Sequence, residues 1–215
     1  MKALGMLEVY SFTTAVVAAD ICAKAADVKI IAFDRTRPGS ADVPAPLVMQ
    51  VKLSGNVAAV KAAIEAGKEY AESVGKYIIS HTIPNPGEGT EKMAYLLDMN
   101  KDKYNKKLPK SFIDEDEGEV LKTSAEAIGM IEVEGLVAAI EGLDTMTKAA
   151  DVRVIHTEKR LGGRLVTFIV AGEVSAVKAA VEAGRKSAAA IGNIFGSAVI
   201  ARPHAELTKF FDMED

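Results

Sequence analysis

The feature that most constrains the fold is a thirteen-residue segment that occurs twice in the chain. Residues 55–67 read GNVAAVKAAIEAG and residues 172–184 read GEVSAVKAAVEAG, so that ten of the thirteen positions are identical. In both copies apolar residues recur every three or four positions, which is typical of an amphipathic helix. A chain with this much self-similarity is a duplication, so its fold consists of one unit built twice.

The duplication extends well beyond this helix. An apolar run of strand length opens each copy, and an alanine-rich helical pattern with Ser11 as a candidate N-cap in the first copy follows it. A second apolar run, an alternating strand, the repeated helix and a last strand complete the unit. The matched segments are, in order, 3–9 and 127–133, 11–26 and 135–150, 28–33 and 152–155, 55–67 and 172–184, and 77–83 and 194–201, and residues 47–53 carry the alternation of the third strand in the first copy.

This order of elements, βαββαβ, predicts an α+β fold of two tandem ferredoxin-like domains, in which the helices cover one face of each sheet. We place the first domain at residues 1–100, a linker at 101–124 and the second domain at 125–215. The linker is polar, basic at its start and acidic at its end, as expected of a solvated connection. Short additional helices are expected at residues 90–100 and 204–211.

The two copies differ in the loop between their second and third strands. The offset between matched residues falls there from 124 to 117, so the first copy carries seven additional residues. Residues 37–46 read RPGSADVPAP, whereas the second copy has only residues 161–163 in this place. A long loop stiffened by proline is either functional or a tolerated surface insertion.

Composition and charge exclude several classes of protein. With 49% hydrophobic residues, 26% charged residues and a net charge of −4, the chain has an ordinary globular composition without the basic bias of nucleic-acid binders. It contains no apolar run of about 18 residues that could span a membrane, and Glu8 comes too early for a signal peptide. We therefore expect a cytoplasmic protein that binds neither nucleic acid nor membranes.

Residues that could carry chemistry are present but do not form a recognisable set. The three histidines, His81, His156 and His204, have no acidic or cysteine neighbours at ligand spacing, so no metal site is expected, and His204 reads as a helix start or a surface residue. Glu8 and its copy Glu132 lie inside apolar strands, where they are either general acids or strand residues that face solvent. No phosphate-binding or nucleophile motif occurs, and we expect no enzymatic activity.

Two glycines and one cysteine point to tight packing. Gly67 and Gly184 lie in helical patterns, where glycine costs roughly 1 kcal/mol relative to alanine, so we expect close approach of the helix backbone to a sheet or to a neighbouring subunit. Cys22 is the only cysteine and lies in an alanine-rich helix, which indicates a small buried side chain.

Five motifs together resemble the shell proteins of bacterial microcompartments, and the resemblance covers nearly the whole chain apart from the linker. They are AIGMIEV at 127–133, the helix end KAADV, GGRLVT at 162–167, GEVSAVKAAVEAG at 172–184 and ARPH at 201–204. Two copies in one chain resemble the tandem-domain type, and the opening strand resembles the unpermuted order. The resemblance implies a homotrimer that forms a hexagonal tile with a central pore, beside other shell proteins, in the shell of a cytoplasmic compartment.

The resemblance also implies which residues line the pore. In this family the turn between the second and third strands does so, and glycine there allows close approach to the axis while arginine places cations near it. We expect a pore for small, anionic metabolites, which the long first loop leaves open, narrowed or plugged. Neither loop contains cysteine, so neither an iron–sulfur cluster nor any other cofactor is expected. The matching residues are Arg37, Pro38, Gly39 and Ser40 in the first copy and Leu161, Gly162, Gly163 and Arg164 in the second.

A second set of residues matches the family's contacts between tiles. Lys24 and Lys148, in the two KAADV motifs, resemble the edge lysine, although a lysine that complements the helix dipole explains them as well. Arg202 resembles the edge arginine, and the first copy has Asn85 in its place, so edge contacts are expected to alternate around the tile.

Two other functions remain open from the residues alone. A ferredoxin-like regulatory protein would bind a small molecule between subunits near the same loops. An enzyme acting on a small substrate is less consistent with the sequence, because no acid, base and nucleophile set is present.

Overall fold

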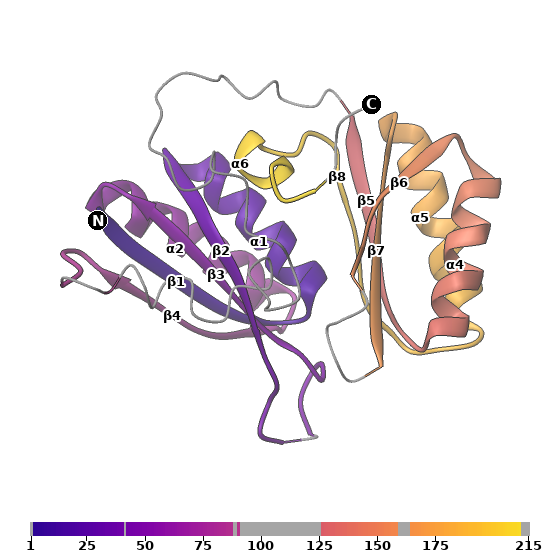
Figure 1. The fold of residues 1–215 in the computed structure, drawn as a ribbon, viewed down its shortest axis with the longest axis horizontal. Helices are drawn as coiled ribbons and strands as arrows, with labels where there is room; N and C mark the ends of the chain where they lie inside the picture. The colour runs from indigo at the N-terminus through magenta and orange to yellow at the C-terminus, as the bar shows by residue number, and fades with distance from the viewer. Residues whose placement is uncertain (1, 41, 88–89, 91–125, 159–163, 212–215) are drawn as a thin grey trace.

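In the computed structural model the chain forms two domains of the same architecture, each a four-stranded antiparallel sheet with two long helices on one face (Figure 1). The structure describes residues 2–40, 42–87, 90, 126–158 and 164–211. The elements of the first domain are β1 (Ala3–Tyr10), α1 (Phe12–Ala25), β2 (Val28–Thr36), β3 (Val48–Gly55), α2 (Val57–Ser73) and β4 (Tyr77–Ile83). Those of the second are β5 (Ala127–Glu134), α4 (Leu136–Ala149), β6 (Val152–Glu158), β7 (Leu165–Gly172), α5 (Val174–Ala189), β8 (Ile194–Ile200) and the short α6 (Ala205–Thr208).

The sheet topology confirms the predicted fold class. The strand orders are β2-β3-β1-β4 and β6-β7-β5-β8, and all neighbouring strands are antiparallel. Both copies therefore have the βαββαβ order. The apolar half of the alternation expected in the third strand is confirmed, because Met49, Val51 and Leu53 are fully buried, but Lys52 on the opposite face is buried as well. None of the described helices is long and apolar enough to cross a membrane.

The sheet of the second domain is buried on both faces. On β5, Ile131 and Val133 pack under the helices of their own domain, whereas Ile128 and Met130, at alternate positions along the strand, belong to the core of the first domain. Successive side chains of a strand point to opposite faces, so this strand joins two cores. Figure 1 shows the consequence: the second sheet lies between its own helices α4 and α5 and the first domain.

Several details differ from the sequence prediction. β2 continues to Thr36, beyond the predicted residue 33. Ser11 precedes α1 but does not cap it with its side chain, because its backbone has φ 78° and its hydroxyl points elsewhere. His204 does begin a helix: its Nδ1 accepts a hydrogen bond of 3.1 Å from the backbone N–H of Glu206. The linker at 101–124 and most of the helix expected at 90–100 lie outside the described residues.

The repeated glycines pack helix against helix. A Cβ atom on Gly67 of α2 would lie 2.5 Å from the sulfur of Cys22 on α1, and one on Gly184 of α5 would lie 2.8 Å from the carbonyl oxygen of Gly142 on α4. The predicted close approach is therefore confirmed, but its main partner is the other helix of the same domain and not the predicted sheet or neighbouring subunit. Burial in this contact also raises the pKa of Cys22 to about 12.

Replacing Gly184 with alanine should destabilise the protein. The new Cβ would lie 2.3 Å from Cγ of Met146 as well as close to the Gly142 backbone, and backbone cannot move aside cheaply. We expect the free energy of unfolding to fall by about 1–3 kcal/mol, although alanine is the better helix former. Urea denaturation followed by circular dichroism measures the change. Gly39→Ala is the matched control, since nothing lies within 4 Å of a Cβ there, and an equal loss in both variants would contradict the packing argument.

Candidate functional site: the junction between the domains

The two domains meet through different surfaces. Helix α1 of the first domain lies against β5 and β8 of the second (Figure 1). On this helix Phe12, Thr13 and Val16 are at most 3% exposed. Gly196 of β8 allows the close approach, because a Cβ there would lie 2.7 Å from Cβ of Thr13. The contact therefore joins a helix face of one domain to the outer sheet face of the other, along β5 and β8.

A buried carboxylate holds this contact at the start of α1. Glu132 of β5 is fully buried, and its Oε2 accepts hydrogen bonds from the Ser11 hydroxyl (2.5 Å) and the Thr13 backbone N–H (3.0 Å), while Oε1 accepts from the Phe12 N–H (3.2 Å). The first N–H groups of a helix have no partner within the helix, and the helix dipole favours a negative charge there. Glu132 thus caps a helix of the other domain. The expectation that it faces solvent is wrong.

A lysine from the first domain adds a second polar link. The Nζ of Lys76, the residue before β4, donates a hydrogen bond to the backbone carbonyl of Phe195 on β8. Burial lowers the pKa of Lys76, and the charge of Glu132 opposes that shift. A cation and a carboxylate therefore stabilise each other inside the junction, which reduces the cost of burying either.

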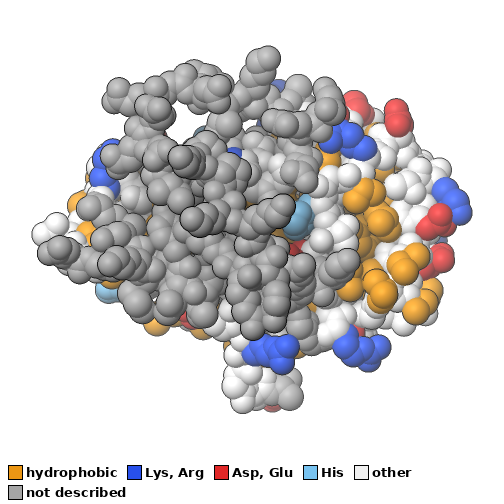
Figure 2. Space-filling view, viewed as in Figure 1, with side chains coloured by type: hydrophobic (Ala, Val, Ile, Leu, Met, Phe, Trp, Pro, Cys, Tyr) orange, Lys and Arg blue, Asp and Glu red, His pale blue; other side chains and the backbone are white. Residues whose placement is uncertain are grey.

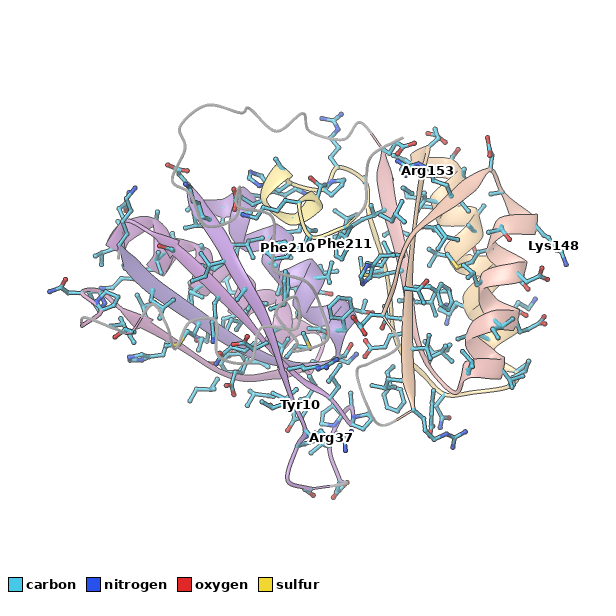
Figure 3. All side chains as sticks on the ribbon, viewed as in Figure 1. Tyr10, Arg37, Lys148, Arg153, Phe210 and Phe211 are labelled. Atoms are coloured by element: carbon cyan, nitrogen blue, oxygen red, sulfur yellow. The ribbon has the colours of Figure 1, made fainter. Side chains whose placement is uncertain are left out.

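The C-terminal segment closes over the first domain from another side. Oε2 of Glu206 in α6 accepts a 2.9 Å hydrogen bond from the backbone N–H of Ile30 on β2. Phe210 packs edge-on against Phe33, with ring centroids 5.0 Å apart, and Phe211 contacts His156 of its own domain at 5.4 Å. Figure 3 shows Phe210 and Phe211 in the space between the domains. The second domain thus contacts the first at both α1 and β2.

The predicted edge residues fall into two groups. Lys24 pairs with Asp20 at 2.5 Å, and the other oxygen of Asp20 accepts a 2.7 Å hydrogen bond from the backbone N–H of His204. Because Arg202 precedes His204 by two residues and is exposed, the structure brings Lys24 and the turn that carries Arg202 to the same side of the junction.

The equivalent residues of the other copy are not brought together. Lys148 pairs with Asp144 at 2.6 Å, and this hydrogen bond raises its pKa, but the side chain is 72% exposed at the outer side of α4, away from the first domain (Figure 3). Asn85 is exposed just after β4 in the first domain. Lys148 and Asn85 thus lie in different domains, and the described residues do not link them.

The described residues of the two expected pore loops are mostly exposed. Arg37, Gly39 and Ser40 are exposed after β2, and Pro38 is half-buried. Figure 3 shows Arg37 where the long β2–β3 loop leaves the sheet. In Figure 1 this loop and the start of β7 lie on the same side of the molecule. Leu161, Gly162 and Gly163 lie outside the described residues.

Arg164 occupies an unusual backbone position before β7. Its φ is 63°, its carbonyl oxygen accepts a 2.8 Å hydrogen bond from the N–H of Gly135, and its guanidinium lies 3.6 Å from Oε1 of Glu134. The side chain is nevertheless 78% exposed. Glu134 therefore offsets part of its positive charge, which sequence reasoning did not anticipate.

Within the described ranges, no three His, Cys, Asp or Glu side chains gather where they could hold a metal ion.

Sequence reasoning missed the junction roles of Asp20, Lys76 and Phe210. The only signal for the junction was an acidic residue conserved between copies inside an apolar strand, Glu8 and Glu132.

Removing the charge of Glu132 should weaken the junction. Glu132→Gln keeps the shape but loses the charge that serves two helix N–H groups and Ser11, and we expect the free energy of unfolding to fall by about 1.5–3 kcal/mol. Urea denaturation measures the loss. Glu182→Gln on the exposed side of α5 is the matched control and should change little; similar stability of both variants would show that the cap contributes nothing.

Comparison with known proteins agrees with this architecture. The BMC domain family matches residues 3–86 and 127–203. The shell protein PduA of Citrobacter freundii is 49% identical over 84 residues (39% of this chain, 89% of that one), and the shell protein EutM of Escherichia coli is 49% identical over 86 residues (40% and 88%).

Two further matches span nearly the whole chain. The carboxysome assembly protein CcmO of a Synechococcus species is 33% identical over 209 residues, covering 95% of this chain and 67% of CcmO. A solved microcompartment protein from Desulfitobacterium hafniense is 25% identical over 97% of this chain and 99% of its own, with a TM-score of 0.37. The chain therefore belongs to the BMC domain family, carries two such domains in tandem and is homologous to bacterial microcompartment shell proteins.

Proposed function

We propose that the chain is a structural shell protein of the tandem-domain, unpermuted type, which forms a homotrimer and thereby a hexagonal tile in the shell of a cytoplasmic microcompartment. It has no catalytic role, adjoins other shell proteins and passes small, anionic metabolites through a central pore. One observation carries this proposal: the two BMC domains of the chain dock through different surfaces, α1 on one side and the outer sheet face at β5 and β8 on the other.

A contact between unlike surfaces can repeat. It generates a closed ring when the rotation from one unit to the next divides the circle evenly. Three chains with two similar domains each would fill six positions of such a ring. The exposed Lys24 and Arg202, and likewise Lys148 and Asn85, would then lie at the rim, where neighbouring tiles meet.

The exposed arginines support the pore assignment. The loop that begins at Arg37 and the start of β7 next to Arg164 lie on one side of the molecule, and threefold repetition would place several cations around one axis. A ring of positive side chains favours anions by electrostatic attraction. Because Glu134 offsets part of the charge of Arg164, we expect Arg37 to contribute more.

The assembly itself is tested by light scattering coupled to size-exclusion chromatography, followed by electron microscopy of concentrated protein. Trimers that form flat sheets support the proposal. A persistent monomer or dimer without sheets would overturn it and favour a small-molecule-binding regulatory protein.

Loss of the edge residues should separate tiling from ring formation. Lys148→Ala combined with Arg202→Ala removes two exposed cations, one on α4 and one in the turn beside Lys24, so we expect trimers to persist while sheets disappear from electron micrographs. Lys61→Ala, an exposed lysine of α2, is the control and should leave sheets intact. Sheets that survive the double substitution would show that the edge lies elsewhere.

Reversing charge at the loops should slow anion entry. In assembled shells, Arg37→Glu is expected to reduce the entry of an anionic substrate about tenfold, because local charge changes the local concentration of ions. Arg164→Glu should have a smaller effect, and Arg185→Glu on the exposed side of α5 should have none. The readout is the rate at which an enclosed enzyme consumes an anionic and a neutral substrate; equal rates for all variants would remove the pore assignment.

A further inference from the structure

The outer face of α4 exposes apolar residues whose counterparts in the first domain are buried. Leu136, Val137 and Ile140 are 60%, 72% and 59% exposed. Their counterparts at an offset of 124 residues are Phe12, Thr13 and Val16, which are 2%, 3% and 0% exposed because the second domain covers them. Figure 2 shows hydrophobic side chains gathered on the second domain. The α4 face is thus equivalent to a surface that is buried within the chain.

The first domain exposes the matching half. Glu8 and Ile79 are register partners on β1 and β4, as Glu132 and Gly196 are on β5 and β8. Ile79 is 56% exposed, and Oε1 of Glu8 accepts a 2.8 Å hydrogen bond from the side-chain amide of Gln50. A carboxylate is therefore held at the position from which Glu132 caps α1 in the other copy.

These two halves cannot meet within one chain. Figure 1 shows α4 and β4 at opposite ends of the molecule, with the intrachain junction between them. Among the described residues, the chain thus has one junction between a helix face and an outer sheet face, and it exposes one further helix face and one further sheet face of the same kind. Only a second copy supplies both missing surfaces at once.

We infer that α4 of one copy docks on β1 and β4 of a second copy, with the Glu8 carboxylate capping the N-terminus of α4. Its oxygens would accept hydrogen bonds from the backbone N–H groups of Leu136 and Val137, as Glu132 accepts from those of Phe12 and Thr13. The apolar α4 face would be buried against the strand edge that carries Ile79. This inference rests on the proposed trimer and names the residues that close it.

The polar part of this second junction differs from the first. The residue before α4 is Gly135, which has no hydroxyl to replace that of Ser11. Gln50 compensates, because it stands where the second domain has Thr167 and binds Glu8 within its own sheet. Each carboxylate thus has one side-chain donor, which comes from the capped helix in one junction and from the capping sheet in the other.

The apolar part differs as well. Gly196 lets α1 approach so closely that any Cβ there would clash with Thr13. In the second junction Ile79 replaces this glycine and Val137 replaces the threonine, so the helix and the strand must lie farther apart and the contact is more apolar. The two domains are therefore not interchangeable.

A designed disulfide tests the contact directly in the full-length protein. Ile79→Cys combined with Val137→Cys places thiols at positions whose counterparts in the first junction nearly touch, and Cβ atoms about 3.8 Å apart suit a disulfide. After mild oxidation we expect covalent dimers and trimers on a non-reducing gel. Cys22 does not interfere, because it is buried and its pKa is raised to about 12.

The controls separate this inference from the proposed function. Each single cysteine variant should give no trimer band, and circular dichroism verifies that all variants fold. Trimers by light scattering without covalent trimers in the double variant would overturn the junction and leave the tile intact. Covalent trimers that never form sheets would support the junction and overturn the tile.

A charge substitution tests the cap. With Glu8→Gln we expect the concentration at which trimers half-dissociate to rise at least tenfold, since the helix N-terminus loses its carboxylate. Glu69→Gln, on the exposed side of α2, is the matched control and should not shift it. An unchanged midpoint for Glu8→Gln would show that Glu8 does not cap the neighbouring helix.

Discussion

The structure depends on one buried carboxylate. Burying a charge is costly unless hydrogen bonds and a compensating charge replace water. Glu132 meets this condition only when the N–H groups at the start of α1, the Ser11 hydroxyl and the nearby Lys76 surround it. The second sheet is therefore fixed in one position on the first domain, and its outer face becomes part of the first domain's core.

Because the two copies dock on each other, equivalent residues of the two domains have different surroundings. Phe12 and Leu136 have equivalent places in equivalent helices, yet one is buried and the other is exposed. The same holds for Glu132 and Glu8. The local fold does not cause these differences, since the sheets and helices of the two domains agree. They arise because the intrachain junction covers α1 of the first domain and the outer sheet face of the second, and leaves the equivalent surfaces exposed.

These differences between the two domains would affect the rim and the pore of a shell tile. The rim of a ring built from this chain would carry Lys24 beside the Arg202 turn at one kind of junction, and Lys148 beside Asn85 at the other. The longer β2–β3 loop with Arg37 would alternate with the shorter loop before Arg164, whose charge Glu134 partly offsets. A fused pair of domains can thus vary pore and rim at alternate positions, which a tile of six identical domains cannot do.

Periodicity and self-similarity determined most of the fold in advance: the βαββαβ order, the burial of Met49, Val51 and Leu53, and the close packing at Gly67 and Gly184 follow from short-range patterns, although those patterns did not name the partner helix. The same patterns misplaced Glu132 and the role of Ser11. The segments LEV and IEV around Glu8 and Glu132 are nearly the same, and the groups that distinguish them lie about 120 residues away in sequence. Only the tertiary structure decided which carboxylate is buried, because a contact between residues far apart in sequence does not change the local hydrophobic periodicity.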